Sequence, residues 1–144
     1  MDSSGFGELE VRGRYISVPS GSSMEPLFTH KENAVEIVKA VHPLRRYDIS
    51  LHEDDSGRGV LHRVMEVRDG SYLICGDNCT VPEEVPAERV KGVVTRFYRN
   101  GRWISVDDRR YRWYVRLWCG TFPLRRYVIR IRNRIKKRRA GCIK

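Results

Sequence analysis

Two Asx-Gly pairs place the strongest constraint on how this chain can fold. Asp69-Gly70 separates residues 59–67 from residues 71–75, and Asn100-Gly101 lies within residues 89–106. The flanking segments are short, rich in Val, Ile and Tyr, and largely alternate between apolar and polar positions. An Asx-Gly pair adopts the left-handed backbone that two-residue hairpin turns require, so both regions are predicted to be antiparallel β-hairpins.

Three further segments, residues 14–18, 34–41 and 47–52, have the same strand-like composition. Gly, Pro, Asn and Asp separate the predicted strands at short intervals. A chain of 144 residues fits one domain with one core. The sequence therefore predicts a small, mostly β domain over residues 1–108, followed by an extension of a different kind.

The extension, residues 109–144, carries 14 of the 28 Lys and Arg residues and none of the 18 acidic residues. Its apolar residues recur every three to four positions, and Asp107 or Asp108 is placed to cap a first helical turn. A basic amphipathic helix with aromatic residues near its start is typical of a segment at an anionic membrane surface, and nucleic acid is the less favoured partner. In the alternative interpretation, the helix packs on the body through three side chains: Tyr114, Trp118 and Leu124.

Several classes of protein are excluded by simple features of the sequence. The N-terminus lacks the basic start and apolar run of a signal peptide, and no segment has the 18–20 uninterrupted apolar residues, roughly, that a membrane-spanning helix needs. We therefore expect a cytoplasmic protein, or one at the inner face of a membrane. The cysteines are too few and too irregularly spaced for a disulfide framework or a zinc site, so reduced thiols and no cofactor or metal are predicted for Cys75, Cys79, Cys119 and Cys142.

The segment GSSMEPLF, residues 21–28, ends in apolar side chains that a surface linker would not need. Gly21 permits a sharp bend, Met24 can anchor the turn in a core, and Pro26 stiffens the exit. A turn of this kind exposes a serine hydroxyl and leaves backbone N–H groups available to stabilise an oxyanion. His62 in the first strand of the hairpin over residues 59–75, and Asp77 after its second strand, would complete an acyl-transfer site.

Four motifs in a fixed order carry a resemblance to known enzymes. The segments GSSMEPLF, YDIS, LHRVMEV and CGDN, followed by RVKGVV, span roughly residues 15–95 and resemble signal peptidase I and its LexA-like relatives among the serine peptidases. The resemblance implies a coiled, mostly antiparallel β fold. It also implies a serine endopeptidase that cleaves a peptide or leader after small residues.

The same resemblance assigns roles to individual residues. Ser23, directly before the methionine, is the implied nucleophile, and His62, directly before Arg63-Val64, is the implied general base in place of the lysine of bacterial enzymes. Imidazole suits this role, because its unperturbed pKa of about 6.5 lies near working pH. Asp77 is ranked first as the acid that orients His62, and Glu83 is ranked second. The backbone amide of Ser23 is expected to stabilise the oxyanion.

Two other functions stay open at this point. One is a LexA-like regulatory domain that binds nucleic acid through its basic end, although no helix-turn-helix precedes the body and the base is not lysine. The other is a catalytically inactive binding module that keeps the fold and contacts a membrane or nucleic acid.

Overall fold

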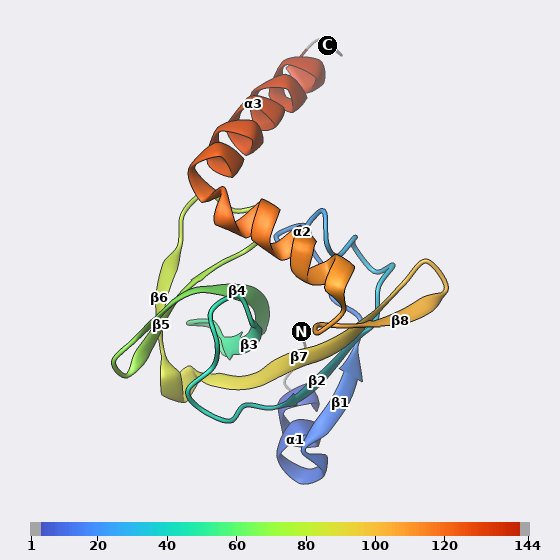
Figure 1. Ribbon diagram of the computed structural model, residues 1–144, viewed down its shortest axis with the longest axis vertical. Helices are drawn as coiled ribbons and strands as arrows, with labels where there is room; N and C mark the ends of the chain where they lie inside the picture. Colours follow the sequence, from blue (N-terminus) through green and yellow to red (C-terminus); the bar gives the residue numbers. More distant parts are fainter. Residues whose placement is uncertain (1–3, 142–144) are drawn as a thin grey trace.

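The computed structural model describes residues 4–141 and is mostly β, with one antiparallel eight-stranded sheet and three α-helices (Figure 1). In chain order the strands are β1 (Arg14–Ser17), β2 (Val35–Lys39), β3 (Ile49–Glu53), β4 (Gly59–Arg68), β5 (Ser71–Cys75), β6 (Glu83–Pro86), β7 (Val90–Arg99) and β8 (Arg102–Ser105). The helices are α1 (Ser4–Arg12), α2 (Arg109–Gly120) and α3 (Phe122–Gly141), and a short 3-10 turn, η1 (Ala87–Arg89), precedes β7.

The sheet follows the order β1-β2-β7-β3-β4-β5-β6, with β8 paired to β7. Both predicted hairpins are confirmed: β4 and β5 meet at Asp69-Gly70, and β7 and β8 meet at Asn100-Gly101. Gly70, Asn100 and Gly101 have the predicted positive φ, whereas Asp69 does not. Figure 1 shows the long strand β7 running across the molecule while β3 and β4 curl tightly beside it. Glu83 at the start of β6 comes within contact of His52 of β3 and His62 of β4.

Two elements were not predicted. Helix α1 contains two glycines, which disfavour a helix, but its Leu9 is completely buried. A Cβ at Gly92 of β7 would lie 3.1 Å from Leu9 Cδ2, so the missing side chain leaves room for the helix to pack. Strand β6 has polar residues and ends in Pro86, a composition that is tolerated because β6 is at the sheet edge.

Helix α2 packs on the body. Asp108, not Asp107, is its N-cap and accepts hydrogen bonds from the amides of Arg110 and Tyr111. Three side chains of α2 belong to the main core, and two more are partly buried against it: Tyr111, Val115 and Cys119, then Tyr114 and Trp118. The first part of residues 109–144 is thus integrated with the β body.

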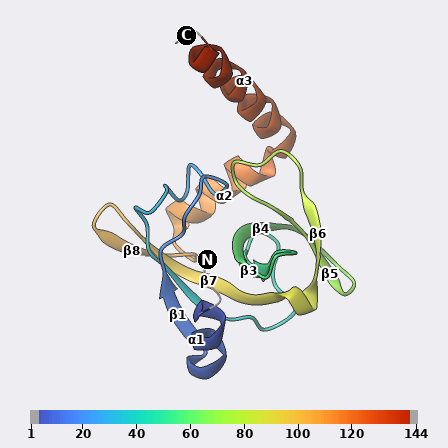
Figure 2. The same cartoon turned by 180° about the vertical axis from the view of Figure 1, so that it is seen from behind.

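Helix α3 leads away from the body, as both views show (Figures 1 and 2). Arg125 and Ile129 are buried, whereas Leu124 is 61% exposed, so the expectation that Leu124 packs on the body is wrong. Cys142, for which a reduced thiol was predicted, lies outside the described residues. Over the described residues, neither α3 nor any other helix combines the length and hydropathy needed to cross a bilayer.

Candidate active site

The serine turn has the conformation that its sequence predicts. Gly21 has φ of 105°, a region open to glycine, and its N–H donates to His30 Nδ1 at 2.8 Å. Met24, Leu27 and Phe28 are buried in the main core, which holds the turn against the sheet. Apolar anchoring of the residues that follow therefore leaves Ser23 half-buried at the surface of the body.

The turn after β5 is tied directly to the serine turn. Asn78 donates its backbone N–H to the Ser23 carbonyl oxygen at 2.7 Å and its side-chain Nδ2 to the Ser22 carbonyl oxygen at 2.9 Å. Gly76 is required at this contact, because a Cβ there would lie 2.6 Å from the Ser23 carbonyl oxygen. The motifs GSSMEP and CGDN, far apart in the sequence, thus form one rigid unit.

His62 lies beside this unit. The same Cβ at Gly76 would lie 3.1 Å from His62 Cδ2, so one edge of the imidazole faces the position where the two turns meet. The other edge faces Glu83, whose Oε1 is 3.2 Å from His62 Nδ1. Because Nε2 is bonded to Cδ2, the ring nitrogen on the side of the serine turn is the one that Glu83 leaves free.

Asp77 has a different role from the one ranked first for it. Its two carboxylate oxygens accept hydrogen bonds from Arg63 Nε and Nη2, both at 2.7 Å, and both side chains are fully buried. Burial alone would lower the pKa of Arg63, but the Asp77 carboxylate raises it well above its ordinary value. The geometry therefore reverses the ranking of the two acids: Glu83 contacts His62, and Asp77 is the counterion of a buried guanidinium.

The C-terminal helices complete the surroundings of Asp77. Tyr114 of α2 donates its hydroxyl to Asp77 Oδ2 at 3.2 Å, and Trp118 donates Nε1 to the Asp77 carbonyl oxygen at 3.0 Å. Arg125 of α3 donates Nη2 to the Gly76 carbonyl oxygen at 3.4 Å, and Arg132 donates Nη2 to Asn78 Oδ1. The aromatic and basic residues of the extension therefore hold the turn that supports Ser23.

Sequence reasoning missed a second histidine. His52 of β3 is 2% exposed, and its Nε2 lies 3.3 Å from Oε1 of Glu83, the same oxygen that contacts His62. Burial and the neighbouring His62 together lower the pKa of His52 to about 4, against the opposing effect of Glu83. His52 is thus a neutral imidazole at neutral pH. The available signal was the strand pairing of residues 49–53 with 59–63, which places two histidines on one face.

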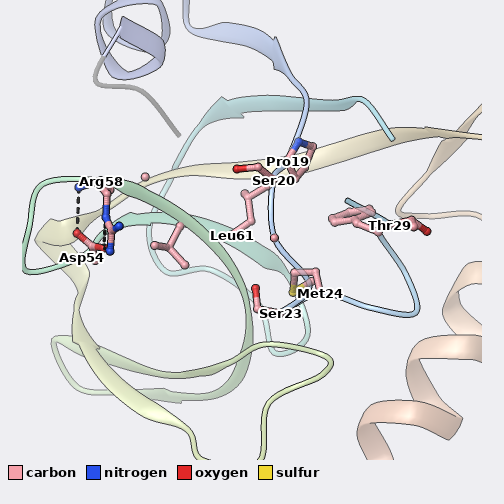
Figure 3. A pocket seen from close by; sticks show the side chains of 12 residues that line it. Pro19, Ser20, Ser23, Met24, Thr29, Asp54, Arg58 and Leu61 are labelled. Atoms are coloured by element: carbon pink, nitrogen blue, oxygen red, sulfur yellow. Dashed lines mark hydrogen bonds and ion pairs between the residues drawn. The ribbon is translucent and has the colours of Figure 1, made fainter. Parts of the chain in front are cut away.

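A groove next to Ser23 has a volume of about 260 Å³. Its walls come from the serine turn, including Ser20, Gly21 and Met24, and from the start of β4, Gly59 to Leu61. Figure 3 shows the Ser23 hydroxyl turned into this groove and the Asp54–Arg58 ion pair at its far end. Both polar and apolar residues line the groove, which lies beside β4, the strand that carries His62.

No protein-family model and no curated protein matches this chain.

Proposed function

We propose that the protein is a serine endopeptidase in which Ser23 is the nucleophile, His62 the general base and Glu83 the acid that orients His62. The observation that carries the proposal is the placement of His62, with Nδ1 on the Glu83 carboxylate and its opposite edge toward the turn of Ser23. A base held in one tautomer by a carboxylate is the arrangement that activates a serine hydroxyl.

The mechanism follows from the roles of the three side chains. With Nδ1–H donated to Glu83, His62 Nε2 accepts the Ser23 hydroxyl proton as Oγ attacks the substrate carbonyl. The backbone N–H of Ser23 would donate to the resulting oxyanion. His62 then gives the proton to the leaving amine, an acyl-enzyme forms, and water, deprotonated by His62, releases the acyl group. No cofactor takes part in these steps.

The substrate class is inferred from the groove and the resemblance. Ser20 and Gly21 of the serine turn and Gly59 of β4 line the groove, and a substrate peptide could bind there beside Ser23. The preference for small side chains next to the scissile bond rests on the resemblance alone. We infer a signal-peptidase-like enzyme that removes a leader or short peptide after small residues.

We further propose that α3 contacts an anionic membrane surface. Four residues at spacing i, i+3, i+4, i+7 form an exposed apolar stripe on α3: Leu124, Tyr127, Val128 and Ile131. Arg130 and Arg134 are exposed on the same helix, and residues 109–144 contain no acid. An apolar stripe beside cationic side chains matches a lipid surface better than a nucleic acid, which would not need the stripe.

The catalytic assignment can be tested with a serine-directed acylating probe. We expect wild-type protein to be labelled on Ser23, and labelling to be lost in Ser23→Ala and His62→Ala. Ser22→Ala is the matched control, because Ser22 lies in the same turn but is held through its carbonyl oxygen, and it should still be labelled. Labelling that persists in Ser23→Ala, or a folded wild type that is never labelled, would refute the peptidase and favour the inactive binding module.

Membrane contact can be tested by co-sedimentation with anionic phospholipid vesicles. Binding should fall as salt is raised, because each Lys or Arg at such a surface contributes about 1 kcal/mol. Leu124→Ser/Val128→Ser should weaken it, whereas Val11→Ser, which changes an exposed apolar residue on α1, should not. Absence of sedimentation together with salt-sensitive binding to DNA would instead favour the LexA-like alternative.

A further inference from the structure

His52, His62 and Glu83 form a cluster of potential metal-ligand atoms, of which the proposed hydrolysis requires only those of His62 and Glu83. His52 Nε2, His62 Nδ1 and a Glu83 oxygen all lie within 4.8 Å of one another. His52 is buried, His62 is nearly so, and Glu83 is 54% exposed. The cluster is therefore buried on the side of His52 and open to solvent on the side of Glu83.

The curled sheet fixes the two imidazoles. In the pairing of β3 with β4, Ser50 is opposite His62 and His52 is opposite Val60, so both histidines are on the same face at diagonal positions. Their ring centroids are 5.7 Å apart. Glu83, at the start of β6, reaches both rings with one oxygen, at 3.3 Å from His52 and 3.2 Å from His62.

The chemistry and spacing of these atoms suit a borderline transition metal. Two imidazole nitrogens and a carboxylate oxygen are a common ligand set for Zn²⁺, bound at about 2.0–2.2 Å in tetrahedral geometry. Ligand atoms around one such ion are about 3.3 Å apart, which two of the three separations already match. A small closure of the two rings would bring the third separation into range, and the exposed side of Glu83 leaves a fourth position for water.

We propose that His52, His62 and Glu83 bind one Zn²⁺ ion, and that this ion inhibits hydrolysis. The second half rests on the proposed function. A metal on His62 Nδ1 separates the ring from Glu83 and leaves the ring proton on Nε2, so Nε2 has no lone pair with which to accept the Ser23 proton. Metal binding and acyl transfer are therefore mutually exclusive at this histidine.

The metal half is tested on the full chain by competition for Zn²⁺ with a chromophoric chelator. We expect one ion per wild-type chain and an affinity lowered about 10- to 100-fold or more in His52→Gln and in Glu83→Gln. His42→Gln is the matched control, because His42 contacts Tyr72 outside the cluster and should bind as wild type does. Mg²⁺ should not compete, since it prefers oxygen ligands.

Two outcomes would overturn the metal site. One is a Zn²⁺ affinity of His52→Gln equal to that of wild type, provided that circular dichroism shows the variant to be folded. The other is a loss of binding in Cys79→Ser with none in His52→Gln, since Cys79 Sγ lies near the opposite edge of the His62 ring.

The inhibitory half is tested by acyl-probe labelling with and without Zn²⁺, each rate being compared with that of the same variant without metal. Zn²⁺ should slow labelling of wild type and His42→Gln and have at least tenfold less effect on His52→Gln. Equal inhibition of all three overturns the inhibitory role. Zn²⁺ binding that depends on His52 in a protein that is never labelled supports the metal site and overturns only the proposed peptidase.

Discussion

His62 and Arg63 are neighbours on β4, yet they belong to two regions of opposite character. The side chain of His62 faces the half-exposed carboxylate of Glu83, whereas Arg63 points to the other face and forms a fully buried ion pair with Asp77. The Glu83 region is open to solvent on the side of Glu83, and one carboxylate oxygen contacts both of its histidines. The Asp77 region is closed and holds them by many.

β4 thus presents the candidate catalytic side chain, His62, on one face and a buried structural ion pair, Arg63 with Asp77, on the other. In addition to Asp77, Arg63 donates to the carbonyl oxygen of Tyr47 and the hydroxyl of Tyr111, both at 2.9 Å. This network fixes the turn that carries Gly76 and Asn78, and through it the backbone of Ser23. The acid that pairs with the buried Arg63 is thus not the acid that contacts His62.

Among the variants considered, Asp77→Asn is expected to lower the free energy of unfolding most. The change leaves the buried Arg63 guanidinium without its counterion, which destabilises a protein by about 3–5 kcal/mol. Because total stability of a domain is about 5–15 kcal/mol, the variant should unfold at a much lower urea concentration than wild type. Urea titration followed by circular dichroism measures this. A midpoint unchanged from wild type would show that the network is not the main support of this region.

Glu83→Gln should have little effect on stability but a large effect on the acylation rate. Glu83 is half-exposed, so the unfolding free energy should change by less than about 0.5 kcal/mol. The acylation rate should fall by about 100-fold or more, because the amide no longer favours the imidazolium that forms on His62. Rates of probe labelling, measured beside the urea midpoint, check both halves. A variant that is labelled at the wild-type rate would remove Glu83 from the mechanism.

The sequence predicted the two hairpins well because their turns are local: Asp69-Gly70 and Asn100-Gly101 encode the turn in adjacent residues. The resemblance of their motifs also singled out Ser23 and His62, and their catalytic roles stay predictions. It ranked the acids wrongly because β6 was not predicted. Without β6, only the resemblance pointed to Glu83, and no residue pattern predicted that this side chain reaches His52 of β3 and His62 of β4.

The buried arginine was in principle visible. Alternation along β4 puts Leu61 and Arg63 on the same face, and a charged residue at a core-facing position needs a buried partner. That partner could have been any acid after β5, since the choice depends on how the turn at Gly76 folds against Ser23. A long-range contact of this kind has no local signature in the sequence.

The double variant Arg63→Met/Asp77→Leu tests the contribution of the ion pair's charges to stability, because it removes both charges while keeping much of the side-chain volume. Replacing a buried ion pair with apolar residues of similar volume is often nearly neutral, because two desolvation penalties are removed. Here the change also leaves the buried Arg125 guanidinium without the Asp77 carboxylate, 3.8 Å away, and the Tyr114 and Tyr111 hydroxyls without their partners. We expect the double variant to lose about 1–3 kcal/mol, less than Asp77→Asn alone. Urea titrations of the two variants in parallel test this, and a double variant less stable than Asp77→Asn would contradict it.

The smallest effect is expected at the junction between the sheet and the helices that cover Asp77. Asp108 caps α2 with hydrogen bonds from the amides of Arg110 and Tyr111, and Asp108→Ala should lower the unfolding free energy by about 1 kcal/mol. Asp107→Ala is the matched control, because Asp107 is adjacent and acidic but is not the cap. Since Tyr111, Tyr114 and Trp118 all reach the Asp77 region from α2, loosening the first turn of this helix should also slow probe labelling of Ser23 slightly. Equal urea midpoints for the two alanine variants would show that the start of α2 is held by its core side chains rather than by the cap. In that case the support of Asp77 comes from packing of the helix, and its N-terminal hydrogen bonds contribute little.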